Sequence, residues 1–307
     1  MAARTAHRDG GVTAAPEVTA ADQDRLRGIA YRMLGSTHDA EDVVAEAVLR
    51  WHRLPEAERA AVREPLAWLT TVVSRLCLDQ LRSARARREQ TAGVWLPEPR
   101  LSDPLAPAGP PDPADVVTLD DTVSFAFLVA LERLSPAERV SFLLHDVFGV
   151  SFAEIAEVVG RTPAACRQLA TSARRHVREE RRYDVADAER DRVVRAFLDA
   201  CRGGDLDRLV GLLDPDVTSV ADGGVHVRVA RRPVVGAATV ARYLLGVMTT
   251  QRRLLGVDPE ATVEPVNGRS GIVIRLGDTV LSTIDLAVRD GLVTRLYLQV
   301  DPEKLAP

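Results

Sequence analysis

The chain has 307 residues with a formal net charge of −4, and 46% of its residues are hydrophobic. This length and apolar content exclude a disordered chain and allow two or three packed domains. Residues 1–17 contain no apolar run, and no stretch approaches the length of a membrane span, so we expect a cytoplasmic protein without a signal peptide. Cys77, Cys166 and Cys201 are far apart and show no metal-ligand spacing, so neither a metal site nor a cofactor is expected.

The N-terminal part begins with residues 1–19, which are rich in Ala, Gly and Thr and are expected to form a flexible tail. A first amphipathic helix follows and ends at Gly35-Ser36, with one buried face formed by Leu26, Ile29, Ala30, Met33 and Leu34. The second helix, Asp39–Trp51, carries four acids in its first two turns: Asp39, Glu41, Asp42 and Glu46. Because acids near a helix N-terminus are stabilising in themselves, capping and solvation explain this cluster without any partner.

A third helix begins at Pro65, after the loop Leu54–Glu64, and continues to Arg88. It ends with four cations within seven residues: Arg82, Arg85, Arg87 and Arg88. The helix dipole favours each cation there by up to about 1 kcal/mol, which explains one or two of them, and four indicate a polyanionic partner. Trp68 lies off the buried stripe, and two interpretations remain open: a platform for an unpaired base, or a side chain packed against the preceding helix.

The stretch Val94–Asp121 divides the helical region into two parts. It has seven prolines between Pro97 and Pro113, and from Glu98 to Asp121 it has six acids against one arginine. This composition forbids regular structure and predicts a stiff acidic linker. Trp95-Leu96 at its start is apolar enough to dock on another part of the protein.

Three helical pieces follow in Leu134–Arg182: Ala137–Val147, Phe152–Val159 and Pro163–Arg178. Ser151 and Thr162-Pro163 are suited to begin the last two pieces, and Gly149 and Gly160 to end the first two. This is the pattern of a helix-turn-helix. Residues 161–182 hold seven arginines against two glutamates, as phosphate binding needs, while an ordinary solvated helix face is the alternative.

Three successive motifs resemble the extracytoplasmic-function (ECF) bacterial sigma factors over roughly Asp22–Arg182. They are DAEDVVAEAVLR, PLAWLTTVVSRLCLDQLRSARARR and LSPAERVSFLLHDVFGVSFAEIAEVVGRTPAACRQLATSARR. The resemblance implies two all-α modules, a sigma-two helical bundle at 20–92 and a sigma-four helix-turn-helix at 122–183, joined by the Pro-rich acidic linker 93–121. It also implies two partners: core RNA polymerase, through its β′ clamp and β flap, and promoter DNA.

The same resemblance assigns roles to individual residues. Polymerase contacts are implied for Asp39, Glu41, Asp42, Glu46, Leu49 and Arg50. The loop Leu54–Glu64 matches the loop that captures a flipped base of the minus-ten element, and contacts with that element are implied for Trp68, Arg75, Arg82, Arg85, Arg87 and Arg88. Contacts with the minus-thirty-five element are implied for Arg161, Thr162, Ala164, Ala165, Arg167, Gln168, Arg174, Arg175 and Arg178. Within that last set, Arg167 and Gln168 suit base edges, and the final three arginines suit phosphates.

The pattern changes in Glu189–Pro307, where 16 basic residues balance 16 acidic ones. Helices are predicted at Val193–Cys201, Asp205–Leu213 and Ala237–Met248, and strands at Val225–Val229, Ile272–Leu276, Thr279–Val288 and Leu292–Val300. Asp290-Gly291 between the last two strands is a hairpin signal. We expect an α+β domain with a curved antiparallel sheet. The order of its elements is similar to the SnoaL-like domains of the NTF2-like superfamily, a cone that encloses a pocket.

Three short motifs resemble those of sigma factors that carry such an extension: WLPEP in the linker, Asp222-Gly223-Gly224, and the tail DPEKL at 301–305. The second departs from the related signature at Val225, where a third glycine would stand. The resemblance implies that 184–307 is a regulatory domain, which docks on the linker and the DNA-binding modules in place of a separate anti-sigma protein. Interdomain contacts are expected at Trp95, Leu96, Pro97, Asp222, Gly223, Gly224, Asp301, Lys304 and Leu305.

Two other classes of function remain open. SnoaL-type enzymes use a pocket carboxylate or imidazole as a general base, but the candidates Asp222, His226 and Asp285 show no partner by spacing, so no enzymatic activity is expected. A helix-turn-helix regulator that senses a small ligand without joining polymerase has no use for the block Asp22–Arg88. We therefore expect a self-regulated sigma factor that directs promoter recognition and transcription initiation, with an unidentified small ligand as an option for the cone.

Overall fold

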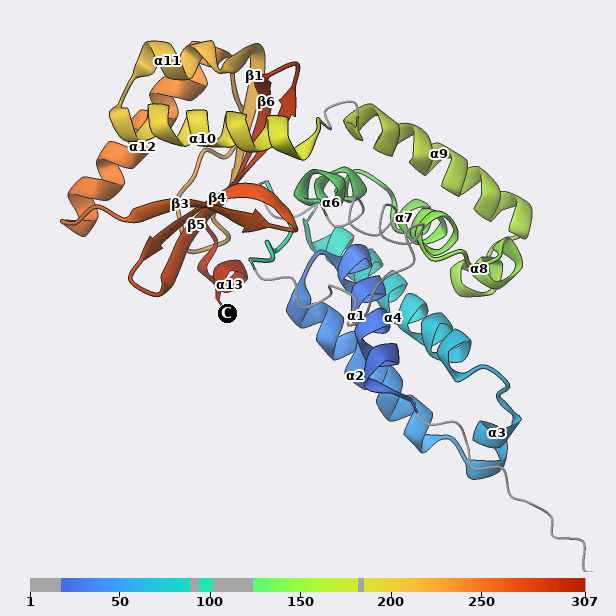
Figure 1. Ribbon diagram of the computed structural model, residues 1–307. Helices are drawn as coiled ribbons and strands as arrows, with labels where there is room; N and C mark the ends of the chain where they lie inside the picture. Colours follow the sequence, from blue (N-terminus) through green and yellow to red (C-terminus); the bar gives the residue numbers. More distant parts are fainter. Residues whose placement is uncertain (1–17, 89–93, 102–123, 182–184, 307) are drawn as a thin grey trace, which may run out of the picture.

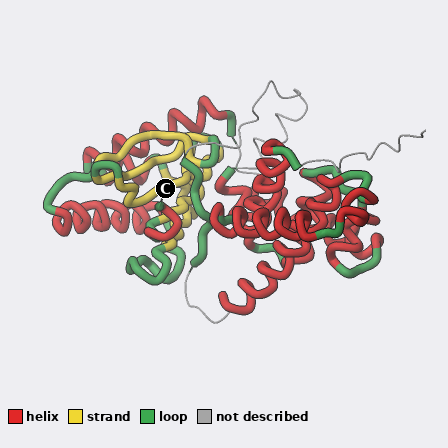
Figure 2. Tube along the Cα trace, turned by 90° about the horizontal axis from the view of Figure 1, so that it is seen from below, coloured by secondary structure: helices red, strands yellow, loops and turns green. Residues whose placement is uncertain are grey.

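The computed structural model describes residues 18–88, 94–101, 124–181 and 185–306. Figure 1 shows the helices of the N-terminal half on one side and the sheet of the C-terminal domain on the other, and Figure 2 shows the same division from below. The linker segment, residues 94–101, contacts both halves. The chain therefore folds into two helical modules and an α+β domain.

The first helical module consists of α1 (Ala20–Leu34), α2 (Thr37–Arg53), α3 (Glu56–Ala61) and α4 (Pro65–Arg88). Helix α1 ends where predicted, at Gly35, whose φ of 71° is left-handed. Helices α1, α2 and α4 pack around a core that includes Leu26, Met33 and Trp51. The predicted loop before α4 was partly wrong, because its sequence EAERAA consists of strong helix formers and folds into α3.

The second helical module consists of α6 (Phe125–Glu132), α7 (Pro136–Phe142), the π-helical turn η1 (Leu143–Val147), α8 (Phe152–Val159) and α9 (Pro163–Arg181). Capping boxes at Ser135 and Ser151 begin α7 and α8, and Gly160 ends α8 with a φ of 73°. These ends confirm the predicted helix-turn-helix. The sequence did not predict α6, whose residues FAFLVALE are apolar on nearly every face because the helix is mostly buried.

The two helical modules share one hydrophobic core rather than two. Helix α4 of the first module packs against α7 and α8 of the second, and α1 packs against η1. The side chain of Arg139 in α7 is buried and donates to the carbonyl oxygen of Met33 in α1, at 2.8 Å. The modules are thus closed onto each other.

The C-terminal domain places four helices against one six-stranded sheet. The helices are α10 (Asp187–Gly203), α11 (Leu206–Gly211), α12 (Ala237–Leu255) and α13 (Pro302–Leu305). The strands are β1 (Leu213–Asp222), β2 (Val234–Val235), β3 (Glu260–Val266), β4 (Arg269–Leu276), β5 (Thr279–Arg289) and β6 (Leu292–Gln299), in the order β2-β1-β6-β5-β4-β3. This is the expected α+β domain. The sheet is mixed rather than antiparallel, because β1 pairs with β6 in parallel.

One predicted strand was wrong. Val225–Val229 forms a turn and a loop, in which the Val227 N–H donates to the Gly223 carbonyl oxygen at 2.9 Å. The strand lies earlier, at β1, where Asp214-Pro215-Asp216 obscures the alternation of buried residues that starts at Val217. The hairpin predicted at Asp290-Gly291 is confirmed between β5 and β6. No helix in the part of the chain that the structure describes is both long and apolar enough to cross a bilayer.

Candidate functional site

The acidic residues of α2 differ in their partners and their exposure, and the exposed Asp42 lies 3.6 Å from His38 one turn earlier. The Asp39 carboxylate accepts a hydrogen bond of 2.7 Å from Gln80 in α4, and Glu46 pairs with Arg50 at 2.8 Å. Glu41, Asp42 and Leu49 are exposed. Arg50 is exposed as well, so four of the six residues predicted to bind polymerase present surface to solvent, while Asp39 also holds α2 against α4.

A groove of about 620 Å³ lies on the same face, between α1 and α2. Val44, Val48 and Leu49 line it with apolar surface, and Arg27 and Glu41 lie among its charged lining residues. An apolar groove with charged groups around it suits a partner helix. All the described residues that line the groove belong to α1 and α2.

The residues predicted to bind the minus-ten element lie on α4. Trp68 is half-buried and packs on Trp51 of α2, with ring centroids 5.4 Å apart, so the packing interpretation describes its position in this closed state. Arg75 donates to the carbonyl oxygen of Glu157 in α8, at 3.2 Å, and Arg82 lies 3.5 Å from Asp79. The side chains of Arg85, Arg87 and Arg88 lie outside the described residues.

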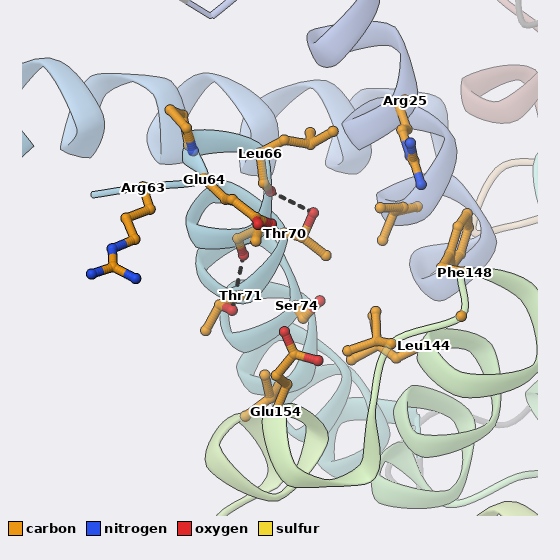
Figure 3. A pocket seen from close by; sticks show the side chains of 16 residues that line it. Arg25, Arg63, Glu64, Leu66, Thr70, Thr71, Ser74, Leu144, Phe148 and Glu154 are labelled. Carbon is orange, nitrogen blue, oxygen red and sulfur yellow. Dashed lines mark hydrogen bonds between the residues drawn. The ribbon is translucent and has the colours of Figure 1, made fainter. Parts of the chain in front are cut away.

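A cavity of about 580 Å³ lies between the first half of α4, α1 and the second helical module (Figure 3). Leu66 and Phe148 give it apolar surface from the two modules. The hydroxyls of Thr70 and Thr71 donate to carbonyl oxygens of their own helix, at 2.7 and 3.0 Å, whereas the buried Ser74 hydroxyl has no hydrogen-bond partner among the described residues. Its lining includes Arg63 and Glu64 of the predicted base-capturing loop but, among the described residues, none of the α4 side chains predicted to bind the minus-ten element.

The residues predicted to bind the minus-thirty-five element lie on and just before α9. The Thr162 hydroxyl caps this helix by accepting from the Ala165 N–H at 3.2 Å. Most of the set is exposed: Arg161, Thr162, Ala164, Arg167, Gln168, Arg175 and Arg178. The half-buried Arg174 pairs with Asp146 of η1 at 2.8 Å, and the Arg167 guanidinium lies 5.2 Å from the Phe152 ring centroid. Helix α9 and the turn before it therefore present mostly exposed polar groups to solvent.

The linker segment is bonded to the C-terminal domain at Leu96, which is 1% exposed. The Leu96 N–H donates to the Asp222 carboxylate at 2.8 Å, and its carbonyl oxygen accepts from the Lys304 ammonium at 2.7 Å. That ammonium lies 4.3 Å from the Trp95 ring centroid, and the Gln299 amide donates to the carbonyl oxygen of Pro97 at 3.2 Å. The end of β1, the end of β6 and α13 therefore form one receptor for the linker segment.

The two glycines after Asp222 allow this receptor to close. Gly224 has a φ of 56°, and a Cβ at this position would collide with the Asp301 carboxylate. A Cβ at Gly223 would collide with the Val227 carbonyl oxygen. Asp301 caps α13 by accepting from the Glu303 N–H at 3.2 Å, and Leu305 of that helix is buried. Val225, where the related signature has a third glycine, is 84% exposed, so a side chain is tolerated there.

The other side of the linker segment is bonded to the first helical module. The Glu98 N–H donates to the carbonyl oxygen of Gly35 at 2.8 Å, and the Glu98 carboxylate accepts from the Thr37 N–H at 2.8 Å. The Tyr31 hydroxyl donates to the Glu98 carbonyl oxygen at 2.8 Å. Burial raises the pKa of the Tyr31 phenol well above its usual range, so the donor proton stays in place.

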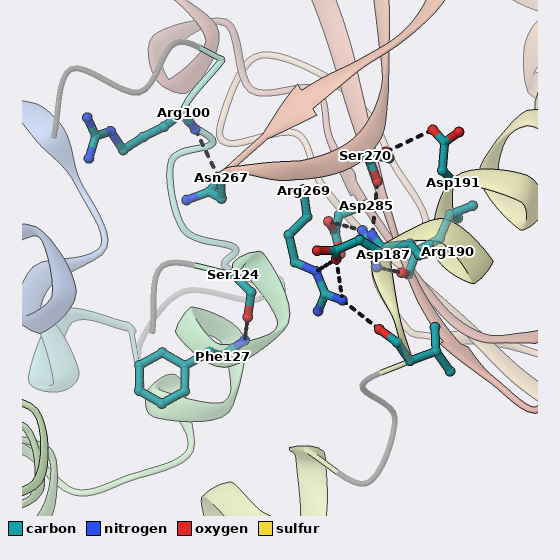
Figure 4. Close-up of polar contacts among 12 residues, drawn as sticks. Arg100, Ser124, Phe127, Asp187, Arg190, Asp191, Asn267, Arg269, Ser270 and Asp285 are labelled. Atoms are coloured by element: carbon teal, nitrogen blue, oxygen red, sulfur yellow. Dashed lines mark hydrogen bonds and ion pairs between the residues drawn. The ribbon is translucent and has the colours of Figure 1, made fainter. Parts of the chain in front are cut away.

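Several of these contact residues were not predicted from the sequence. Tyr31, Glu98, Arg100, Asn267 and Gln299 join the linker segment to its neighbours, and Figure 4 shows the contact between Arg100 and Asn267. The available signal was the Asn267-Gly268 pair, which is typical of a hairpin turn. That signal gives the turn but not what the turn contacts.

The three residues considered for catalysis do not share a site. Asp285 is buried and pairs with Arg190 of α10 at 2.7 Å, and Figure 4 shows this pair joining the helix to the sheet. Asp222 is bound to Lys304 at 2.6 Å. His226 lies 2.8 Å from Glu303 at the surface. Each group thus has a structural partner of its own.

Two family models match the helical half: Sigma-70 region 2 matches residues 20–87, and Sigma-70, region 4 matches residues 124–177. The chain is 40% identical to the ECF RNA polymerase sigma factor SigJ of Mycobacterium tuberculosis, over 92% of this chain and 90% of that protein. The chain belongs to the ECF RNA polymerase sigma factors. This ECF sigma factor is also 38% identical to the probable ECF RNA polymerase sigma factor SigI of M. tuberculosis, over 92% of this chain and 91% of that protein.

The likeness of this ECF sigma factor to SigJ includes the C-terminal domain. The crystal structure of M. tuberculosis SigJ matches with a TM-score of 0.70 and 39% identity, and the match covers 92% of this chain and 95% of that chain. As a sigma factor the protein binds core RNA polymerase and promoter DNA in transcription initiation. Its Sigma-70, region 4 match contains the helix-turn-helix.

Proposed function

We propose that this ECF sigma factor controls its own promoter recognition through the C-terminal domain, in place of a separate anti-sigma protein. The observation that carries the proposal is the position of the linker segment, which is held on one side by Asp222 and Lys304 and on the other by Tyr31 and Thr37. The parts responsible are 20–92 and 122–183 for polymerase and DNA, 93–121 as the linker, 184–307 as the regulatory domain, and 1–19 as a tail.

The closed packing of the helical modules is incompatible with simultaneous contact to both promoter elements. Positions minus ten and minus thirty-five are about 25 base pairs apart, which is roughly 85 Å of duplex at about 3.4 Å per pair. Here Arg75 on the minus-ten helix is hydrogen-bonded to α8 of the minus-thirty-five module. Promoter binding therefore requires the modules to separate, and anything that holds the linker segment opposes this separation.

The proposed surfaces for polymerase and DNA are assigned from the exposed residues. Glu41 and Leu49, which line the apolar groove, and the exposed Asp42 next to Glu41 would bind the β′ clamp of polymerase, because such a groove suits a helix. The second helical module would contact the β flap and insert the start of α9 into the major groove at the minus-thirty-five element. Helix α4 would hold the melted minus-ten element after the cavity between the modules opens.

This arrangement favours an order of events. The proposed polymerase-binding groove is lined, among the described residues, by α1 and α2 and stays accessible in the closed state, whereas Arg75 of the minus-ten set is hydrogen-bonded to α8. Polymerase would therefore bind first, and separation of the modules would follow on the enzyme. A small ligand in the cone would shift this equilibrium only by its differential affinity for the docked and open states.

Run-off transcription tests the proposal. The full chain is compared with a chain that ends at Arg182, each with core polymerase on a panel of promoter templates. We expect different promoter preferences or yields, because removing the C-terminal domain frees the linker segment. Equal behaviour of the two chains on every template would refute the regulatory role and leave the sigma-factor assignment unchanged.

A further inference from the structure

The C-terminal domain contains two hairpin turns that have the same backbone conformation, but one is buried and the other is exposed. Asn267-Gly268 joins β3 to β4 with φ values of 51° and 76°, and Asp290-Gly291 joins β5 to β6 with the same two values. The Asp290 side chain is 92% exposed, as is usual for a turn. Asn267 is 1% exposed. Turn geometry alone therefore does not explain the burial of Asn267.

The burial of Asn267 comes from contact with two other parts of the chain. Its N–H donates to the Arg100 carbonyl oxygen at 2.8 Å, and its side-chain oxygen accepts from the Arg100 N–H at 3.0 Å. Its side-chain nitrogen donates to the Tyr31 hydroxyl at 2.8 Å. The side-chain amide thus makes one bond to the linker segment, which Figure 4 shows, and one to the first helical module.

The end of α1 contacts the C-terminal domain, the linker segment and the second helical module. The Tyr31 hydroxyl contacts Asn267 and Glu98, the Met33 carbonyl oxygen accepts from Arg139 of the second helical module, and Gly35 accepts from the linker segment. These contacts fall within five residues of α1 and its cap. A change in the position of this end of α1 would therefore alter contacts in both helical modules.

We propose that the Asn267-Gly268 turn is a clasp that closes the C-terminal domain directly onto α1 of the first helical module. It acts separately from the receptor for Leu96, in which Asp222, Gln299 and Lys304 bind the backbone of the linker segment. When the clasp is released, the end of α1 becomes more mobile, and so does the Met33 carbonyl oxygen to which Arg139 donates. The clasp therefore opposes separation of the two helical modules. This inference rests on the proposed function, because it names a contact through which the C-terminal domain acts.

Amide hydrogen exchange of the full chain tests the clasp. Asn267→Gly keeps a residue that tolerates a positive φ and removes both side-chain hydrogen bonds. We expect exchange at the amides of Thr37 and Glu98 to accelerate by roughly tenfold, the change expected for the loss of one or two buried hydrogen bonds. Asp290→Gly is the matched control, because it makes the same replacement in the same kind of turn away from the helical modules, and it should leave these amides unchanged.

A second variant separates the clasp from general destabilisation. Tyr31→Phe removes the hydroxyl on which Asn267 rests, so the double variant with Asn267→Gly should accelerate exchange by less than the product of the single effects. Exchange in Asn267→Gly equal to that of the wild type, or equal acceleration by Asp290→Gly, would overturn the clasp.

The outcomes also distinguish the clasp from the proposed function. If the chain ending at Arg182 differs in transcription while Asn267→Gly exchanges like the wild type, the clasp is wrong and the regulatory role stands. If Asn267→Gly accelerates exchange while the two chains transcribe alike, the clasp exists and the regulatory role is wrong.

Discussion

The ammonium group of Lys304 lies 2.6 Å from a carboxylate oxygen of Asp222, and both groups bind the backbone of Leu96 between them. Lys304 is the only lysine in the sequence. The pair is mostly buried, with side-chain exposures of 16% and 5%. The two members of this ion pair satisfy the N–H and the carbonyl oxygen of one residue. The pair therefore determines which residue of the linker docks on the C-terminal domain.

Lys304→Met should weaken this docking. The substitution keeps an apolar chain of similar length and leaves the Asp222 carboxylate buried without its cation, which typically costs about 3 kcal/mol. The loss should appear as a lower urea midpoint for the fluorescence change of Trp95, whose ring lies beneath the ammonium. Arg289→Met is the control, since its pair with Asp214 is more exposed and should contribute less than about 1 kcal/mol. Equal shifts in the two variants would contradict the importance of the buried pair.

Adding Asp222→Asn to Lys304→Met tests the same pair in a second way. With both charges removed, no buried carboxylate is left without a partner, so the double variant should be more stable than the sum of the single losses predicts. Strict additivity in the urea experiment would mean that the two side chains do not act as a pair.

The thiol groups should be slow to react in the folded protein. Burial raises the pKa of Cys201 to about 12 and raises the pKa of Cys77 and Cys166 as well. Because the thiolate is the nucleophile, a raised pKa leaves almost no reactive form at about pH 8. A disulfide reagent should therefore modify the native chain slowly and all three thiols at once after unfolding. A fast-reacting thiol in the native chain would contradict the described burial.

Local punctuation in the sequence was sufficient to predict much of the helical half. Ser151 and Gly160 mark the ends of α8 as predicted, because an N-cap hydroxyl and a left-handed glycine act within one turn. Helix α6 and strand β1 were missed, since α6 lacks a polar face and β1 begins with Asp and Pro. The periodicity of apolar residues identifies helices and strands that have one buried face. It fails for elements that are buried on all faces or whose apolar pattern is interrupted.

The residues of the candidate site could be predicted only where a short local motif contains them. Trp95, Asp222 and Lys304 were predicted to contribute to interdomain regulation from short motifs, and the structure brings them together. Tyr31 and Asn267 are 236 positions apart, and no local pattern relates them. Their contact depends on how three folded parts are placed, so it becomes visible only with the tertiary structure.

Polymerase binding should depend on the exposed acids of α2. Asp42→Arg reverses an exposed charge beside the α1–α2 groove and should lower the affinity for core polymerase by about tenfold, a typical effect of opposing charge at an interface. Asp278→Arg makes the same change at an exposed turn of the C-terminal domain and is the control. Titration of labelled polymerase measures both. Unchanged affinity in Asp42→Arg would refute the assignment of this face to polymerase.

The start of α9 should separate base reading from phosphate binding. Gln168 and Arg175 are both exposed on this helix, but Gln168 lies in its first two turns, which would enter the major groove in the proposed binding mode, and Arg175 lies further along. Gln168→Ala should cost about 1–3 kcal/mol on the preferred minus-thirty-five sequence and relax specificity at one base pair. Arg175→Ala should weaken binding to all sequences alike and reduce the slope of log affinity against log salt by about one. Holoenzyme binding to a set of single-base promoter variants at several salt concentrations measures both effects. If Gln168→Ala weakened every promoter equally, or Arg175→Ala altered the base preference, the two roles would have to be exchanged.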